Sequence, residues 1–262
     1  MVALVLVGVL TVAYLWAAYG QRRRWSHLHT WAFLAGSGVL ILALSPPVAH
    51  WAHHDLRGHM VQHLAIGMLV SLAWVLAAPM TLLLRQLPTP YARRVVAWLQ
   101  SAPVRVIAHP CVTLLLNIGG MYLLYLTPLF VATQHSPILH HWLHFHFLVA
   151  GYLFCWSILA APDATPHRVS RRLRLGVLTL SIAAHGVLGK LMYGYGWPRG
   201  TSHSLEDIQA AAQLMYYGGD LAEALLAIAL FSLWYRRSGR RRAGFATRGV
   251  HEKMPIHHPA RH

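Results

Sequence analysis

Long apolar runs separated by short polar stretches form the main pattern of this chain. Each run is about as long as the roughly 20 residues that a helix needs to cross the hydrocarbon core of a bilayer. The pattern predicts an all-α integral membrane protein, built as a bundle of seven transmembrane helices. The predicted spans cover residues 1–20, 29–48, 59–84, 109–131, 142–161, 174–196 and 208–235.

Two stretches interrupt this pattern. Residues 90–108 mix Arg with Val and Trp and contain Pro103, so we expect them to lie on the inner membrane interface and not to span it. Residues 236–262 are basic, with Gly and Pro but few apolar residues, so we expect a disordered tail. The sequence thus predicts one transmembrane domain, residues 1–235, followed by a basic cytoplasmic tail, residues 236–262.

The basic residues fall in alternate loops. Most of the 22 Lys and Arg residues follow the first, third and fifth spans or lie in the tail, whereas the opposite loops hold only Arg57 and Arg199. Cytoplasmic loops of membrane proteins carry an excess of Lys and Arg. The charge pattern therefore places the N-terminus outside and the C-terminus in the cytoplasm.

The composition agrees with a chain surrounded by lipid. It is 56% hydrophobic and 11% charged, whereas about a quarter of the residues of a soluble domain are charged. The formal net charge of +15 would otherwise indicate nucleic-acid binding, but no soluble module is left to carry it. We expect the lipid bilayer, and no nucleic acid, as a partner. Cys111 and Cys155 lie in separate apolar runs, which predicts neither a disulfide framework nor a thiolate metal site.

Histidine is the unusual polar residue of this chain, with 20 copies, most of them in the predicted outer half. His59 and His63 are four residues apart at the start of the third span, so they share one helical face and can reach one metal ion. Met60 lies between them. The alternative is that these histidines only contact headgroups or water at the interface.

A second group of histidines precedes the fifth span. His140 and His144 are four residues apart, and His141 and His144 are three apart, so they form a face that can meet the third span. His185 falls near the middle of the sixth span. A polar residue there is costly unless it faces the bundle interior and finds a partner.

Carboxylates accompany these imidazoles. Asp207 opens the seventh span, and most of the seven carboxylates lie outside or within the membrane. Imidazoles and carboxylates that converge from four helices predict either a metal site or a proton path. Several methionines add thioether sulfur, which selects Cu(I) when it is combined with histidine, although most are expected to be core residues.

The segment from His59 to Leu84, HMVQHLAIGMLVSLAWVLAAPMTLLL, resembles the signature of the seven-helix CtaG-type cytochrome c oxidase assembly proteins. The resemblance covers roughly residues 30–235. Two positions differ: Ile208 separates Asp207 from Gln209, and Tyr216 stands where the family often has Trp. Its further motifs are His141, His144, Gly151 and Trp156; His185 and Gly189; and Asp207, Gln209, Met215 and Tyr216.

The resemblance implies an assembly factor for heme–copper cytochrome c oxidase in the cell (plasma) membrane. Such a factor would pass copper to oxidase subunit II or to another oxidase subunit. With Cu(I) as the metal, the expected ligands are His59, His63 and His144, joined by His140 and Met60. Residues expected to orient these ligands or to stand in for them are His185, Asp207 and His141.

Two other functions are compatible with the same residues. A b-type heme held between two of His63, His144 and His185 would make the protein a membrane electron carrier. A copper or proton transporter would instead use the intramembrane His185, Lys190, Asp220 and Glu223 as a path. An enzyme is not expected, because the sequence shows no nucleophile–base arrangement.

Overall fold

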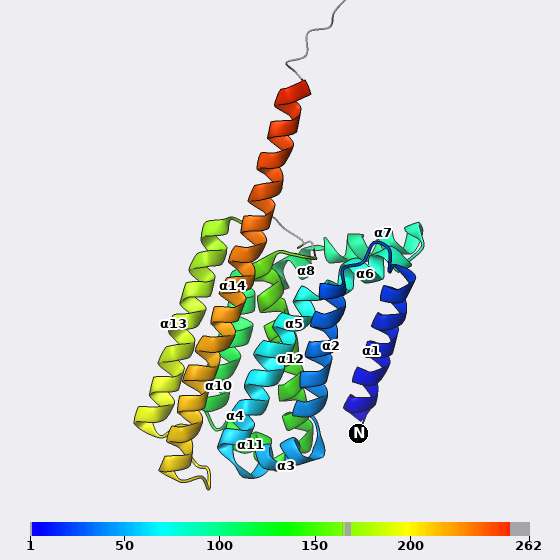
Figure 1. Ribbon diagram of the computed structural model, residues 1–262. Helices are drawn as coiled ribbons and strands as arrows, with labels where there is room; N and C mark the ends of the chain where they lie inside the picture. The colour runs from blue at the N-terminus through cyan, green and yellow to red at the C-terminus, as the bar shows by residue number, and fades with distance from the viewer. Residues whose placement is uncertain (1, 164, 166–168, 252–262) are drawn as a thin grey trace, which may run out of the picture.

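The computed structural model describes residues 2–163, 165 and 169–251, and for residues 237–251 it describes the backbone alone. Over these residues the chain forms helices and no strand, which confirms the all-α prediction. Long helices stand side by side, and short helices lie across both ends of the bundle (Figure 1).

Several helices are long and apolar enough to cross a membrane, which confirms a membrane protein. In the described part of the chain there are five such helices, or up to seven if each of two bent pairs forms one span. Seven spans and the orientation of the termini stay predictions. The five are Val2–Gly20, Leu56–Leu76, Pro137–Leu159, Arg171–Tyr195 and Leu205–Arg236, and the bent pairs are His27–Ala43 with Pro46–His54 and Pro110–Tyr125 with Leu129–His135.

Proline breaks two of the predicted spans. The axis bends by 56° between α2 (His27–Ala43) and α3 (Pro46–His54). A second bend of 77° follows Tyr125, and α11 (Leu129–His135) begins just after Pro128. Proline lacks the N–H that continues a helix and disfavours helical geometry in the residue before it. The predicted spans 29–48 and 109–131 are therefore not straight helices.

The third predicted span also ends early. Its helix comprises α4 (Leu56–Leu64), the π-helical η1 (Ala65–Val70) and α5 (Ser71–Leu76). Ala78 then adopts a left-handed φ of 52°, and α6 (Pro79–Gln86) starts a new direction. Asp163 accepts hydrogen bonds from the backbone N–H groups of Met80 and Thr81. The predicted span from 59 to 84 thus consists of two helical segments. Pro79 fixes the break between them, and Asp163 caps the start of α6.

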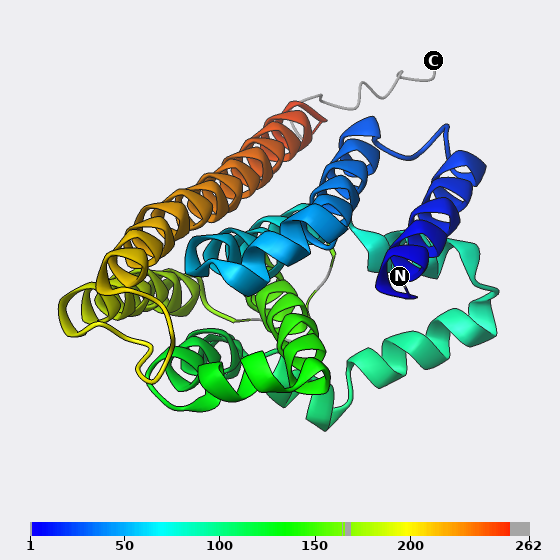
Figure 2. The same cartoon turned by 90° about the horizontal axis from the view of Figure 1, so that it is seen from below.

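The remaining elements complete the bundle. Figure 2 shows α1 (Val2–Gly20) at its edge, and α7 (Thr89–Leu99) and α8 (Ala102–Ile107) lie across the end where α14 leaves it (Figure 1). The fourth predicted span is built from α9 (Pro110–Leu114), η2 (Leu115–Gly119) and α10 (Gly120–Tyr125). The last three long helices are α12 (Pro137–Leu159), α13 (Arg171–Tyr195) and α14 (Leu205–His251).

The backbone of α14 is helical as far as His251, so the first part of the segment expected to be disordered continues this helix. Residues 252–262 lie outside the described residues. The division of the chain at residue 235 stays a prediction.

Candidate metal centre

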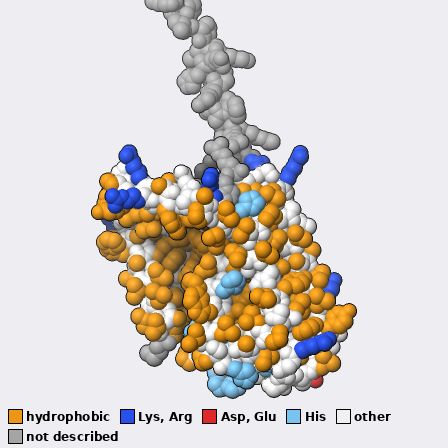
Figure 3. All heavy atoms as spheres, turned by 180° about the vertical axis from the view of Figure 1, so that it is seen from behind, with side chains coloured by type: hydrophobic (Ala, Val, Ile, Leu, Met, Phe, Trp, Pro, Cys, Tyr) orange, Lys and Arg blue, Asp and Glu red, His pale blue; other side chains and the backbone are white. Residues whose placement is uncertain are grey.

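Histidine side chains gather at one end of the bundle, opposite the end that carries most of the Lys and Arg (Figure 3). The short helices α3 and α11 lie at this histidine-rich end, together with the beginnings of α4 and α12 (Figure 1). Because basic residues favour the cytoplasmic side, this arrangement agrees with the expectation that the histidines face outward.

Asp55 sets the start of the helix that carries the first histidine pair. Its side chain caps α4 by accepting a hydrogen bond of 2.8 Å from the Arg57 N–H, and it forms an ion pair of 2.7 Å with the Arg57 guanidinium. Arg57 thereby lowers the pKa of Asp55 to about 2. The anionic cap satisfies one of the free N–H groups at the helix start, so α4 begins one turn before His59.

His59 and His63 are both buried, with 5% of each side chain exposed. His59 packs edge-on against Phe130 and Tyr125, with ring centroids 5.1 and 6.2 Å apart. Its Nε2 atom has no hydrogen-bond partner among the described residues. A buried polar atom without a partner is costly, so this nitrogen marks a place where a ligand would be stabilising.

The second pair of histidines lies on the first turns of α12. Ser136 caps this helix and Pro137 occupies its first turn, two features that favour a helix start at this point. The rings of His140 and His144 are 4.4 Å apart, and His140 also lies 6.4 Å from His59. The two predicted pairs therefore meet at the same end of the bundle.

His63 lies one helical turn further into the bundle than His59, and there it contacts a sulfur atom. Its Nε2 lies 3.2 Å from Sδ of Met121 on α10, and its ring packs edge-on against Phe147 at 4.3 Å. His63 thus lies between the outer histidines and the interior of the bundle.

The other predicted residues have different surroundings, although the ring of His141 lies 6.3 Å from that of His140. Met60 is fully buried in the apolar core that also contains Leu56 and Tyr125. The exposed His141 makes a hydrogen bond of 2.6 Å from Nδ1 to the carbonyl oxygen of Pro137. Asp207 accepts a hydrogen bond of 2.8 Å from the Ser204 hydroxyl and so belongs to the cap of α14.

His185 lies deep in the bundle, where it faces a carboxylate. Its Nδ1 is 3.7 Å from Oε1 of Glu223, and each side chain is 2% exposed. Ser181 donates a hydrogen bond of 3.2 Å to the same oxygen. Glu223 also lines a cavity of about 20 Å³, which has room for about one water molecule. The buried imidazole of His185 thus has a carboxyl group as its polar neighbour.

The imidazoles of His59, His140 and His144, at the histidine-rich end, do not form a complete ligand set in their present orientations. Among the residues that the structure describes, no group of three or more His, Cys, Asp or Glu side chains is placed to hold a metal ion. His63 and Met121 bring one imidazole nitrogen and one thioether sulfur within 3.2 Å of each other. A metal ion at this end would require the rings of His59, His140 and His144 to turn toward one another.

Three residues of this region, His53, His203 and Met121, are not among the predicted site residues, and a fourth, Glu223, was predicted only for the alternative transporter path. His53 stacks on His140 at 4.8 Å, and His203 is within electrostatic range of His59. Met121 and Glu223 contact His63 and His185 from other helices. His53 and His203 were predicted to lie on the same side of the membrane as the expected ligands, and this was the available signal in the sequence. The other two contacts join residues far apart in the sequence, and helical spacing does not reveal them.

These features define a helical membrane protein with histidines gathered at one end and methionine and carboxylate partners below them. A family model described as cytochrome c oxidase caa3 assembly factor (Caa3_CtaG) matches residues 12–237. The chain belongs to this family, which confirms the resemblance seen in the sequence.

Three mycobacterial proteins that resemble this chain are longer than it is. Uncharacterized proteins of Mycobacterium bovis and Mycobacterium tuberculosis are each 28% identical to it over 257 residues, which is 88% of this chain and 38% of the relative. An uncharacterized protein of Mycobacterium leprae is 31% identical over 169 residues, 60% of this chain and 25% of the relative. The chain therefore spans less than two fifths of the length of these relatives. No solved structure matches it.

Proposed function

We propose that this protein assists the assembly of cytochrome c oxidase in the plasma membrane, by binding copper at the outer face and passing it to an oxidase subunit. Membership of the assembly-factor family supports the general role. The observation that carries the copper step is the buried, unpartnered Nε2 of His59 beside the His140 ring. Subunit II, which carries the outward-facing copper centre, is the proposed acceptor.

The chemistry of the site suits a monovalent copper ion. Metal-binding imidazoles must be neutral, and His59 and His63 lie among the aromatic side chains of Phe130, Tyr125 and Phe147. Imidazole and thioether together favour Cu(I) over harder cations. We assign His59, His63 and His144 as principal ligands and His140 as a further one, while Met60 would have to turn out of the core to join them.

The arrangement also suits transient binding. His53 is exposed and His140 is half-buried, so a partner subunit can approach the outer imidazoles directly. His59 and His63 lie deeper, where protein atoms surround them. A ligand set that forms by ring rotation binds copper less tightly than a preformed one, and this favours release to a partner. In this proposal Asp207 and His185 do not bind copper directly. Asp207 helps to fix the start of α14, and His185 acts through its contact with Glu223.

The two alternatives have less support. A heme ligated by His63 would need space beside that ring, and Phe147, Tyr125 and Met121 occupy it. A path through the membrane would need Lys190 and Asp220 near His185. Both are instead exposed on the surface of the bundle, and Lys190 lies over the Tyr216 ring at 5.6 Å.

Oxidase assembly in cells that lack the native gene tests this function. We expect His59→Asn and His63→Asn variants, expressed at wild-type level, to leave membranes with low oxidase activity that added copper partly restores. His27→Asn is the matched control, because His27 is exposed at the start of α2, at the opposite end of the bundle. Full oxidase activity in both variants without added copper would contradict the proposed site.

A further inference from the structure

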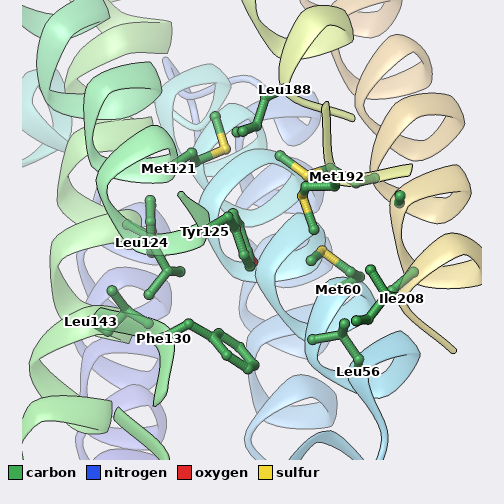
Figure 4. Packing of buried hydrophobic residues seen from close by; sticks show 14 of the residues in the cluster. Leu56, Met60, Met121, Leu124, Tyr125, Phe130, Leu143, Leu188, Met192 and Ile208 are labelled. Carbon is green, nitrogen blue, oxygen red and sulfur yellow. The ribbon is translucent and has the colours of Figure 1, made fainter. Parts of the chain in front are cut away.

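Four methionines belong to one core cluster in the interior of the bundle. Met60, Met121, Met192 and Met215 come from α4, α10, α13 and α14, and each is at most 1% exposed within one core cluster. Figure 4 shows Met60, Met121 and Met192 reaching from separate helices into the space around Tyr125. Half of the 8 methionines of the chain thus lie in a single cluster.

One of these sulfurs already contacts a predicted copper ligand. Sδ of Met121 lies 3.2 Å from Nε2 of His63. This contact directs the free nitrogen of His63 toward the methionine cluster and away from the outer surface. An ion held by His63 would therefore have a thioether beside it on its inner side.

A second, independent feature of the same cluster is an unsatisfied polar atom. Tyr125 is fully buried, and its hydroxyl has no hydrogen-bond partner among the described residues. Its ring lies edge-on to both His59 and His63, with centroids 6.2 Å away in each case. A purely apolar core would favour Phe at this position, because a buried hydroxyl without a partner is destabilising.

The residue type matters as much as the position. Leucine fills a core as well as methionine and has better-defined rotamers, whereas the thioether adds a soft donor atom that suits Cu(I). A buried positive charge also needs compensation. The carboxyl group of Glu223 is buried on α14, the helix that also carries Met215, and it lies 3.7 Å from His185 on α13, the helix that carries Met192.

We propose that this cluster is a second, thioether-rich Cu(I) site, with His63 and Met121 at its outer boundary and Met60, Met192 and Met215 as the inner ligands. This inference rests on the proposed copper function and divides it into two places. The outer imidazoles exchange copper with partners, and the inner thioethers hold it away from water.

X-ray absorption at the copper edge tests the inner site. The detergent-purified full chain is loaded with Cu(I) under anaerobic conditions, once with ordinary methionine and once with selenomethionine. We expect copper–sulfur scattering in the first sample and copper–selenium scattering in the second. Copper surrounded only by nitrogen and oxygen would overturn the inner site and leave the outer one standing. A protein that binds no copper would overturn both.

Leucine variants assign the ligands. Met121→Leu and Met192→Leu conserve side-chain volume, so we expect them to fold, and thermal unfolding checks this. Each should reduce the sulfur scattering and lower Cu(I) affinity by about tenfold or more, a loss typical of removing a group that supports a metal site. Met80→Leu is the control, because Met80 is half-buried outside the cluster. Equal scattering and affinity in all three variants would overturn the assignment.

Discussion

Nδ1 of His185 lies 3.7 Å from Oε1 of Glu223, and both side chains are almost fully buried between α13 and α14. Both ring nitrogens of His185 and Oε2 of Glu223 lack hydrogen-bond partners among the described residues. The two groups therefore depend on one another, because removal of either leaves the other buried without a counterpart.

A double-mutant cycle measures this dependence. We expect His185→Leu to lower the free energy of unfolding in detergent by about 1–3 kcal/mol, because the buried carboxyl group of Glu223 loses its polar neighbour. The double variant His185→Leu with Glu223→Leu should recover part of that loss, because no polar group is left buried without a counterpart. Losses that simply add would show that the pair does not interact.

Gly219 makes room for His185. A Cβ atom at this position would overlap the imidazole ring, so Gly219→Ala should force the ring aside and lower the free energy of unfolding by about 1–3 kcal/mol. Gly194→Ala on α13 is the matched control, because nothing lies near its added Cβ. Thermal unfolding in detergent compares the two variants, and equal midpoints would contradict the packing.

The cap of α4 should respond to acid. The pKa of Asp55 is lowered from 3.8 to about 2 because the Arg57 guanidinium stabilises the carboxylate. The carboxylate therefore contributes its full stability above about pH 4 and loses it as the pH falls toward 2. Asp55→Ala should cost about 0.5–2 kcal/mol at neutral pH, whereas Asp55→Asn, which still caps the helix, should cost less and respond less to acid. If the free energy of unfolding of wild type and Asp55→Asn falls equally in acid, protonation of Asp55 is not the cause of the loss.

Asp163 holds the break before Pro79. Its carboxylate accepts hydrogen bonds from two backbone N–H groups and from the hydroxyl of Thr81 at the start of α6. Asp163→Ala should lower the free energy of unfolding by about 1–3 kcal/mol, because these donors lose their partner. Asp163→Asn retains an acceptor oxygen and should be milder. Thermal unfolding separates the two, and a neutral Asp163→Ala would contradict the capping role.

The sequence predicted the helical membrane class because long apolar runs leave a backbone few alternatives to helix in lipid. The ends of the helices were less predictable, although proline residues in the sequence mark them. Pro46, Pro79 and Pro128 each mark a break, but apolar residues continue on both sides of them. Hydrophobicity alone therefore extended the predicted spans through positions where the backbone turns.

The candidate site was predicted only in part, because the sequence reveals neighbours on one helix but not contacts between helices. Spacing of three or four residues brings histidines onto one helical face, so the pairs on α4 and α12 were visible in the sequence. The contacts from His63 to Met121 and from His185 to Glu223 join residues that are 58 and 38 positions apart in the sequence and lie on different helices. Such contacts depend on helix packing and on the two π-helical turns, η1 and η2, which follow His63 and precede Met121.

Copper content and visible absorption of the detergent-purified protein, expressed with copper and heme precursors both supplied, test the central claim most directly. We predict bound copper without a Soret band, and loss of that copper in the His59→Asn, His63→Asn double variant but not in His27→Asn. A strong Soret band without copper, or full copper retention in the double variant, would contradict it.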